Sequence, residues 1–370
     1  MANNNKHTGP NVPALRFPEF SGEWSKVLLS SACEINPKTD SLDSQFLYID
    51  LESVVKGTLA KRQIIEKDGA PSRAQRVLKE NDILYQCVRP YQLNNYFFEG
   101  DTIQCVASTG YAQLRTKHNP LYVFHALHTK QFTNQVLERC TGTNYPAINS
   151  SDLGTVEVPI CSLPEQEKIG SLLALIDSRI KTQSKIIEEQ ETLLKSLADK
   201  LISAQPANVA LCECVEAKSS TMKESELESS GEFSVYGASG LCGFCSDALE
   251  ESDSILITKD GSGVGTCQYA TEKHSFLGTL CSLTAKENVY LPYIYYALLN
   301  FNFASYKTGQ AIPHIYFKDY GKATIYCPSY VEQIRIASGL KKLDAKINAD
   351  IELLKQYRLQ KEFLLSRMFI

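Results

Sequence analysis

Few residues in this sequence have the types and spacing that catalysis needs. The segment Lys-Asp-Gly-Ser-Gly-Val-Gly at 259–265 follows an apolar run, as phosphate-binding loops do, but it lacks the Gly-Lys-Ser/Thr ending that contacts phosphate and Mg²⁺. A turn is therefore the favoured interpretation. Asn144-Tyr145-Pro146 resembles only superficially the Asn/Asp-Pro-Pro-Tyr stretch of amino-methyltransferases.

A metal-binding site is supported as weakly as a phosphate-binding loop. Cys242-x-x-Cys245 follows a Cys-x-Cys pair at 212–214, but no second Cys-x-x-Cys completes the usual zinc pattern. His125 and His128 stand three residues apart in a run expected to be helical, where core or surface positions are more common than metal ligation. We expect no catalytic residue, no metal and no cofactor on this chain.

Length and composition place the chain among globular proteins of two or three domains. It has 370 residues, 43% of them hydrophobic and 22% charged, with a net charge of -4. The longest apolar runs, 172–176 and 291–301, are far shorter than the roughly 20 residues that cross a bilayer. The polar start predicts a flexible tail over 1–14 rather than a secretion signal, so the twelve cysteines are expected as mostly buried thiols in a reducing cytoplasm.

An internal repeat is the strongest signal in the sequence. Residues 141–180 align without a gap on residues 308–347 at a constant offset of 167, and about a third of the positions are identical. The shared pattern is Thr-Gly-x-x-x-Pro-x-Ile, followed further on by Ser-x-x-Glu-Gln. The chain therefore contains two copies of one large unit, and each copy ends in the same element.

That element is predicted to be a long helix. Ser162 and Glu165 have the spacing of a capping box, and Ser329 and Glu332 repeat it. Residues then recur at alternating spacings of four and three over about five heptads, a pattern typical of coiled coils. The predicted heptad positions are Ile169, Leu173, Ile176, Ile180, Gln183, Ile187, Gln190, Leu194, Leu197 and Leu201 in the first copy, and Ile336, Leu340, Leu343, Ile347, Asp350, Leu354, Tyr357, Lys361, Leu364 and Met368 in the second.

The two helices are predicted to pair with each other, antiparallel and in a pseudo-two-fold arrangement, because the segment between them is long enough to be a domain. The polar heptad residues Gln183, Gln190, Asp350 and Lys361 would then set the register at some cost in stability. The alternative is that each helix packs separately on its own globular body.

The segments before the helices are predicted to mix α and β structure. Short apolar or alternating runs bounded by Asp, Asn and Gly indicate strands at 45–55, 81–91, 102–115, 232–237, 253–265 and 274–285, and helical runs at 121–140 and 291–307. The predicted class is α+β. Two mixed α/β domains, 15–160 and 207–328, are joined by long helices at 161–206 and 329–370 that form an antiparallel coiled coil.

This layout resembles the DNA specificity subunit of type I restriction-modification enzymes, which has two target recognition domains alternating with two long helical regions. The resemblance covers almost the whole chain and rests on the repeated helix entry, where the second copy has Val331 in place of Pro164. The segments 15–35, 81–95, 108–115, 235–243 and 257–265 also resemble the family.

The resemblance implies a non-catalytic subunit that recognises a bipartite, non-palindromic DNA site, one part per recognition domain. The helices would fix the separation of the two parts. It also implies partners: two methyltransferase subunits that use S-adenosylmethionine to methylate an adenine flipped out of the duplex, and restriction subunits that use ATP and Mg²⁺.

In the first domain, residues 56–89 hold eight cations and four acids although the chain is acidic overall. Cations suit phosphates, and arginine suits O6 and N7 of guanine. The candidate DNA-binding residues, which include polar residues of the following loop, are Lys61, Arg62, Arg73, Arg76, Gln86, Arg89, Tyr91, Asn94 and Asn95. The alternative is an ordinary solvated loop.

The second domain has no arginine between Arg179 and Arg335. It is therefore expected to read adenine, thymine methyl groups or DNA shape rather than guanine, unless lysine supplies that contact. Its candidates are Lys259, Ser262, Gln268, Lys307, Gln310, His314 and Tyr316. The acidic stretch 211–251 should face away from DNA or toward a partner.

Two other function classes stay open from the sequence. A coiled-coil adapter that binds only proteins is favoured by the net acidity and by the polar heptad positions. A self-contained nuclease is the third class, and the lack of a catalytic constellation argues against it.

Overall fold

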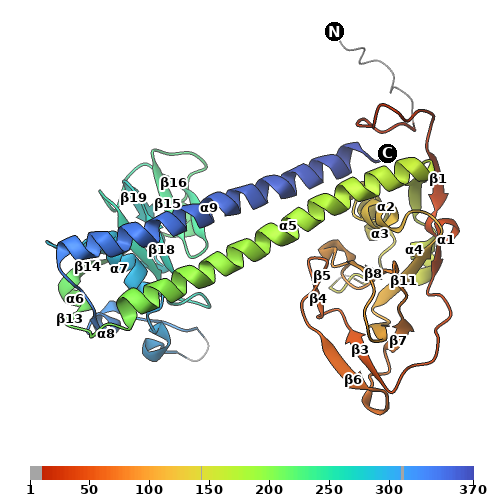
Figure 1. The fold of residues 1–370 in the computed structure, drawn as a ribbon. Coiled ribbons are helices and arrows are strands. Elements are labelled where there is room, and N and C mark those ends of the chain that lie inside the picture. The colour runs from red at the N-terminus through yellow and green to blue at the C-terminus, as the bar shows by residue number, and fades with distance from the viewer. Residues whose placement is uncertain (1–10, 143, 310–311) are drawn as a thin grey trace, which may run out of the picture. The chain divides into compact units, whose positions relative to one another are not determined.

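The computed structural model describes residues 11–142, 144–309 and 312–370. The chain divides into two compact units: unit 1 comprises residues 1–182 and 354–370, and unit 2 comprises residues 183–353. Each unit holds a body of mixed helix and sheet together with segments of two long helices (Figure 1), so the predicted α+β class is confirmed. No helix in the described residues is long and apolar enough to cross a membrane.

The body of unit 1 is built from short sheets. Four strands form a mixed sheet in the order β6-β3-β10-β7, where β10 pairs with β3 in parallel, and four more form the antiparallel sheet β2-β11-β8-β9. β1 pairs with β12, and β4 with β5. The strands are β1 (Ser25–Leu28), β2 (Cys33–Ile35), β3 (Gln45–Ile49), β4 (Val54–Val55), β5 (Thr58–Leu59), β6 (Gln63–Glu66), β7 (Ala74–Val77), β8 (Ile83–Gln86), β9 (Tyr96–Phe97), β10 (Cys105–Ser108), β11 (Tyr111–Thr116) and β12 (Glu157–Ile160).

Four short helices complete this body: α1 (Leu29–Ala32), α2 (Pro120–Ala126), α3 (Lys130–Glu138) and α4 (Ser150–Gly154). The predicted single helical run at 121–140 is thus two helices. The second helix, α3, begins after Thr129, whose hydroxyl accepts a hydrogen bond from Phe132 N and caps the helix.

The body of unit 2 follows the same plan with fewer strands. Its main sheet has the order β14-β20-β17-β18, a second sheet has the order β16-β15-β19, and β13 pairs with β21. The strands are β13 (Val209–Ala210), β14 (Val215–Ser219), β15 (Phe233–Gly237), β16 (Gly240–Cys245), β17 (Ser254–Thr258), β18 (Cys267–Ala270), β19 (His274–Phe276), β20 (Leu280–Ala285) and β21 (Thr324–Ile325). Its short helices are α6 (Leu211–Cys214), α7 (Leu291–Leu298) and α8 (Phe317–Tyr320).

The long helices are α5 (Leu163–Ala198), which continues as a π-helical turn over Asp199–Ser203, and α9 (Tyr330–Arg367) (Figure 1). Most predicted heptad residues are buried or partly buried on them. Leu201 is an exception, since it is 38% exposed while Ile202 is 2% exposed. Because a π turn contains more residues than an α-helical turn, the residues that follow it are rotated, and Ile202 takes the buried position in place of Leu201.

The two helices run antiparallel. In unit 1, Lys361 of α9 forms an ion pair with Asp177 of α5 (2.5 Å). In unit 2, the buried carboxylate of Asp350 accepts hydrogen bonds from Gln190 of α5 (3.0 Å) and from Lys346 (2.8 Å). The polar heptad residues are thus paired where they are buried. Lys346 and, to a lesser degree, Gln190 lower the pKa of Asp350.

The glutamates that were predicted to complete the capping boxes, Glu165 and Glu332, bind arginine side chains. The carboxylate of Glu165 is buried and forms a two-bond ion pair with Arg16 (2.7 and 2.8 Å), while Glu332 pairs with Arg335. The glutamine that follows, Gln166, accepts from the backbone of Asn119 and donates to the carbonyl of Cys161. Gln166 therefore links α5 to the start of α2 and to the end of β12.

The same glutamine contacts recur in unit 2, which extends the repeat beyond the matching sequence. Gln333 accepts from Tyr290 N and donates to the carbonyl of Pro328. In both units a buried tyrosine of the short helix also donates to a strand carbonyl: Tyr122 to Pro159 in unit 1, and Tyr293 to Tyr326 in unit 2. α2 and α7 are therefore equivalent elements, although both lie outside the matching segments 141–180 and 308–347.

The chain ends close the core of unit 1. Phe369 packs on Trp24 and Tyr122, with ring centroids 6.2 and 5.3 Å apart, and Met368 belongs to the same hydrophobic cluster. At the other end, the carbonyl of Asn11 accepts from Trp24 N. Residues 11–14 of the predicted flexible tail are therefore docked, while residues 1–10 lie outside the described residues.

Replacing Phe369 by alanine should destabilise unit 1 by about 3–5 kcal/mol, because it leaves a cavity beside Trp24. Trp24 is the chain's only tryptophan, so urea unfolding followed by its fluorescence reports on this unit. Phe363→Ala is the matched control: its ring is 55% exposed, and we expect a change within about 0.5 kcal/mol. Equal effects of the two substitutions would show that the chain end is not part of the core.

The two units differ at one contact between the short and long helices. In unit 2, Tyr296 of α7 donates to Asp344 of α9 (3.3 Å). The equivalent residue in unit 1 is His125, which is 1% exposed, lies 3.9 Å from Asp177 and has no hydrogen-bond partner among the described residues. Burial and, to a lesser degree, Lys361 lower the pKa of His125 well below its ordinary value, and burial lowers the pKa of His128 to about 4.

Both histidines are thus neutral in the folded chain, while in the unfolded chain they take up protons below a pH of about 6.5. The contribution of the two neutral histidines to the free energy of unfolding should be fully present above that pH. It should decrease as the pH drops from about 6.5 toward 4. His125→Tyr installs the residue of unit 2 and should make this fall shallower, measured by urea unfolding at pH 7.5 and 5.5 with Trp24 fluorescence. His125→Phe should also flatten it but without a bond to Asp177; an unchanged pH dependence in both variants would contradict the assignment.

Candidate nucleic-acid interface

The repeated Thr-Gly-x-x-x-Pro motif forms a loop that closes on itself. In unit 1, the backbones of Thr141 and Ala147 exchange two hydrogen bonds of 2.9 Å. The loop then pairs with the segment that follows the central strand β8: Arg89 N donates to the carbonyl of Pro146 (2.8 Å) and Ile148 N to that of Cys87 (3.0 Å). We call the segments 87–95 and 141–148 the paired loops of unit 1.

Unit 2 has the same arrangement after its strand β17. Thr308 and His314 exchange backbone hydrogen bonds, Gly261 N donates to the carbonyl of Pro313 (3.0 Å), and Ile315 N donates to that of Lys259 (2.9 Å). The segments 259–266 and 308–315 are therefore the paired loops of unit 2, and the candidate Gln310 lies outside the described residues. These hydrogen bonds make Gly261 the structural counterpart of Arg89.

Both closed loops require glycine. Gly142 has a φ of 90° and Gly309 one of 86°. A Cβ on these residues would lie 3.1 Å from the carbonyl oxygen of Tyr145 and 2.4 Å from that of Ile312, respectively. The repeated glycine is thus explained by backbone geometry, and the variable residues between glycine and proline are free to differ.

Two candidate DNA-binding residues are buried and support the loop from within. The Gln86 side chain, 3% exposed, donates to the carbonyl of Val88 (2.7 Å) and accepts from Asn94 N (3.2 Å). Asn95, 1% exposed, accepts from Gln86 N (2.8 Å). Their prediction as base contacts is corrected: in this structure both amides are turned inward, because the loop's backbone groups need partners away from water.

Arg89, Tyr91 and Asn94 are more accessible. The Arg89 guanidinium lies over the ring of Tyr145, 4.4 Å from its centroid, and Tyr145 is 65% exposed. Tyr91 is also exposed, while the Asn94 side chain accepts from the backbone of Lys56 (2.9 Å). Tyr145 was not among the predicted residues, although the repeat places it at the variable position between the glycine and the proline.

The remaining cations of unit 1 have different surroundings. Lys61 and Arg73 are exposed, and Arg62 is exposed but pairs with Asp101 (2.7 Å). Arg76 is partly buried and its Nε has no partner among the described residues, while burial lowers its pKa. Lys61 and Arg73 therefore have the surroundings that a phosphate contact needs.

In unit 2, the paired loops carry a histidine and an acid. His314 Nδ1 lies 2.6 Å from Asp260 Oδ1, and the histidine ring is nearly parallel to that of Tyr316 (18°, centroids 6.5 Å apart). The Gln268 amide donates to the carbonyl of Gly237 (2.9 Å), so this donor is already used. Among the other candidates, Ser262, Lys307 and Tyr316 are exposed and Lys259 is partly buried.

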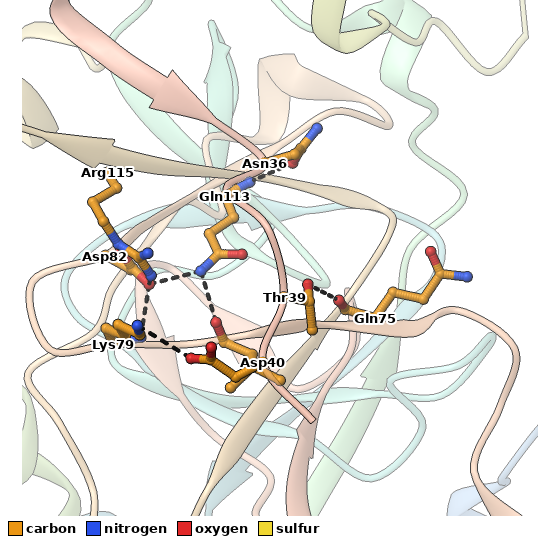
Figure 2. Close-up of polar contacts among 9 residues, drawn as sticks. Asn36, Thr39, Asp40, Gln75, Lys79, Asp82, Gln113 and Arg115 are labelled. Atoms are coloured by element: carbon orange, nitrogen blue, oxygen red, sulfur yellow. Dashed lines mark hydrogen bonds and ion pairs between the residues drawn. The ribbon is translucent and has the colours of Figure 1, made fainter. Parts of the chain in front are cut away.

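A buried ion pair fixes the start of β8 (Figure 2). The carboxylate of Asp82 is fully buried and receives two bonds from Arg115 (2.8 and 2.7 Å), one from the Gln113 amide (2.7 Å) and one from Lys79 N (2.7 Å). The Lys79 ammonium group also forms an ion pair with Asp40 (3.1 Å), which is drawn as a dashed line in Figure 2. β8 is thus held against β11 at one end and leads into the paired loops at the other.

The residues considered for catalysis and metal binding are placed separately. The glycine-rich segment 259–265 links β17 to β18 as a turn. The thiols of Cys242 and Cys245 contact the carbonyls of Val235 and Asp247. Among the described residues no group of three or more His, Cys, Asp and Glu side chains could hold a metal ion, and each of the twelve cysteines, all of them described, is a free thiol.

Comparison with known proteins supplies the family. The family model for the type I restriction modification DNA specificity domain matches residues 22–192 and 209–356, which is well over half of the chain. The HindI type I restriction enzyme specificity subunit of Haemophilus influenzae is 24% identical over 164 residues. That match spans 43% of this chain but only 33% of the relative's length.

Solved structures agree on the fold. A crystal structure of the type I restriction-modification S subunit from M. genitalium has a TM-score of 0.66 at 20% identity, covering 97% of this chain and 99% of that one. A structure from a study of complex assembly and conformational transition of the type I R-M system has a TM-score of 0.54 at 19% identity, covering 94% and 97%.

Replacing Gln86 by leucine tests the internal support of the paired loops. The substitution keeps the volume but leaves the Val88 carbonyl and the Asn94 amide without their partners, so unit 1 should lose about 1–3 kcal/mol. Urea unfolding followed by Trp24 fluorescence measures the change. Gln75→Leu is the control, since this exposed amide donates only to the Ser72 carbonyl; a loss as large as that of Gln86→Leu would argue against the support.

Proposed function

The chain belongs to the type I restriction modification DNA specificity family, and from that premise we propose that it is the subunit that reads the DNA sequence of a bipartite, non-palindromic site. Each unit binds one part of the site through its paired loops. The observation that carries this proposal is that both units build the loops with the same backbone hydrogen bonds but place different side chains on them. A shared frame with variable side chains is what two readers of different base sequences need.

In unit 1, exposed cations contact the DNA backbone and the paired loops contact bases. Lys61 and Arg73 suit phosphates because they are exposed. Tyr91 and Arg89 lie on the same loop, which supports a place for them at the base edges.

In unit 2, the base-contacting groups are His314, Tyr316 and Ser262, with Lys307 on the phosphates. The chain has no arginine from 180 to 334, so this unit depends on histidine, hydroxyl groups, lysine and DNA shape.

The chain performs no catalysis itself and directs partner subunits in the cytoplasm. Two methyltransferase subunits, which bind S-adenosylmethionine, and restriction subunits, which bind ATP and Mg²⁺, carry out the reactions. Their docking is assigned to apolar residues that the long helices leave exposed: Leu175, Leu359 and Phe363 in unit 1, and Ile186, Leu193, Ile351 and Leu353 in unit 2. Exposed apolar residues of this kind favour contact with other proteins.

Binding of the assembled complex to DNA should depend steeply on salt. If six or more phosphates are contacted, the affinity should fall by about 10³ or more between 50 and 200 mM salt. Selection from two DNA libraries, each randomised in one part of the site, should give two separate sequence preferences, and a scrambled duplex measures non-specific binding. Binding without any sequence preference would contradict sequence reading by this chain, and the absence of DNA binding would support the protein-only adapter instead.

A further inference from the structure

The paired loops of unit 1 contain a residue whose backbone conformation does not suit its type. Arg89 has φ 54° and ψ 55°, the left-handed region that non-glycine residues rarely adopt. It also precedes Pro90, which disfavours helical conformations in the residue before it. Its counterpart in unit 2 is Gly261, with a φ of 93°, which adopts such a conformation without steric strain because it has no Cβ. An arginine at this position therefore suits the backbone less well than glycine would, which points to a use for its side chain.

The arginine side chain is held in place but keeps its donors free. Its guanidinium stacks on Tyr145 at 4.4 Å, and within the described part of the chain its N–H groups donate to no acceptor. Arg16, Arg62 and Arg115, in contrast, bind carboxylates. A stacked guanidinium with unused N–H groups is arranged to bind a group outside this chain.

The loop that carries Arg89 is also rigid before any ligand arrives. Gln86 binds the carbonyl of Val88 next to Arg89, and Pro90 starts a 3-10 turn that Leu93, a second left-handed residue, ends. Arg89 N itself is bonded to the closed loop at Pro146. Little conformational entropy is therefore lost when the guanidinium binds.

We propose that Arg89, positioned by Tyr145, reads a guanine in the part of the site bound by unit 1, donating two hydrogen bonds to O6 and N7. This inference rests on the proposed function and deepens it. Unit 2 cannot make the contact in this way, because Gly261 has no side chain and the neighbouring acid and histidine, Asp260 and His314, bind each other. Arg89 and its glycine counterpart thus account for a difference in base preference between the two units.

The test uses the assembled complex and the DNA library randomised in the part read by unit 1. Arg89→Gly is the central variant, because glycine is the native residue at the equivalent position and relieves the strained backbone. It should fold at least as stably as the wild type by Trp24 fluorescence, and it should lose discrimination at a single guanine position by about 5- to 150-fold. Arg89→Lys should lose part of this discrimination, since lysine lacks the planar guanidinium that stacks on Tyr145 and fits O6 and N7 together.

Two further variants separate reading from simple attraction. Arg73→Ala should weaken binding to all sequences alike and make the salt dependence shallower, without changing any base preference. Tyr145→Leu removes the ring under Arg89 and should reduce discrimination at the same guanine position, while Tyr145→Phe should keep it.

The outcomes are distinguishable. A wild-type complex without sequence preference would overturn the proposed function and this inference with it. A wild-type preference that Arg89→Gly leaves intact at every position, or a loss spread evenly over all sequences, would overturn the inference alone and make Arg89 a bystander or a phosphate contact. Loss at one guanine position, together with the Tyr145 result, supports it.

Discussion

Burial of the apolar seam on the two long helices is the constraint on which the rest of this structure depends. A helix with a heptad stripe cannot stand alone in water, and here each unit covers part of α5 with part of α9. In unit 1 the residues that follow α9 also take part, and Met368 and Phe369 complete a core that includes Trp24. Residues that are far apart in the sequence therefore fold as one unit. The same seam explains why its polar members are paired, since an unpaired buried charge would cost several kcal/mol.

The contacts that hold the paired loops and the starts of the long helices, here called the frame, are repeated in both units, whereas the side chains on the loops differ. The frame is repeated through backbone hydrogen bonds and through a few side chains that satisfy them, such as Gln166 and Gln333. Backbone groups do not depend on residue type, so the loops can keep one geometry and vary in chemistry. Among the residues repeated in both units, the glycines Gly142 and Gly309 are required by that geometry. This division lets one fold carry a guanidinium on tyrosine in one unit and an acid with a histidine in the other.

The heptads, the repeat and the mixed class were predictable because each has a periodicity or a spacing that survives without knowledge of the fold. The predictions failed where a local irregularity or burial decided. The π turn after Ala198 moved the seam from Leu201 to Ile202, and the cap at Thr129 split a helical run. Gln86 and Asn95 are residue types that often contact bases, but here their side chains are buried and bind backbone groups of the loop. The sequence pattern does not show which backbone groups need such partners.

The sequence alone therefore determined the architecture: two copies of one unit, two heptad helices, and a family resemblance that the family model supports. Hydrophobic periodicity and spacing are properties of the chain itself, and they carry this information directly. Only the tertiary structure decided which polar residues face outward, that Arg89 and Gly261 are equivalent, and that Tyr145 lies beneath the guanidinium. Those facts depend on hydrogen bonds between segments more than fifty residues apart, whose partners are chosen by packing rather than by neighbouring sequence.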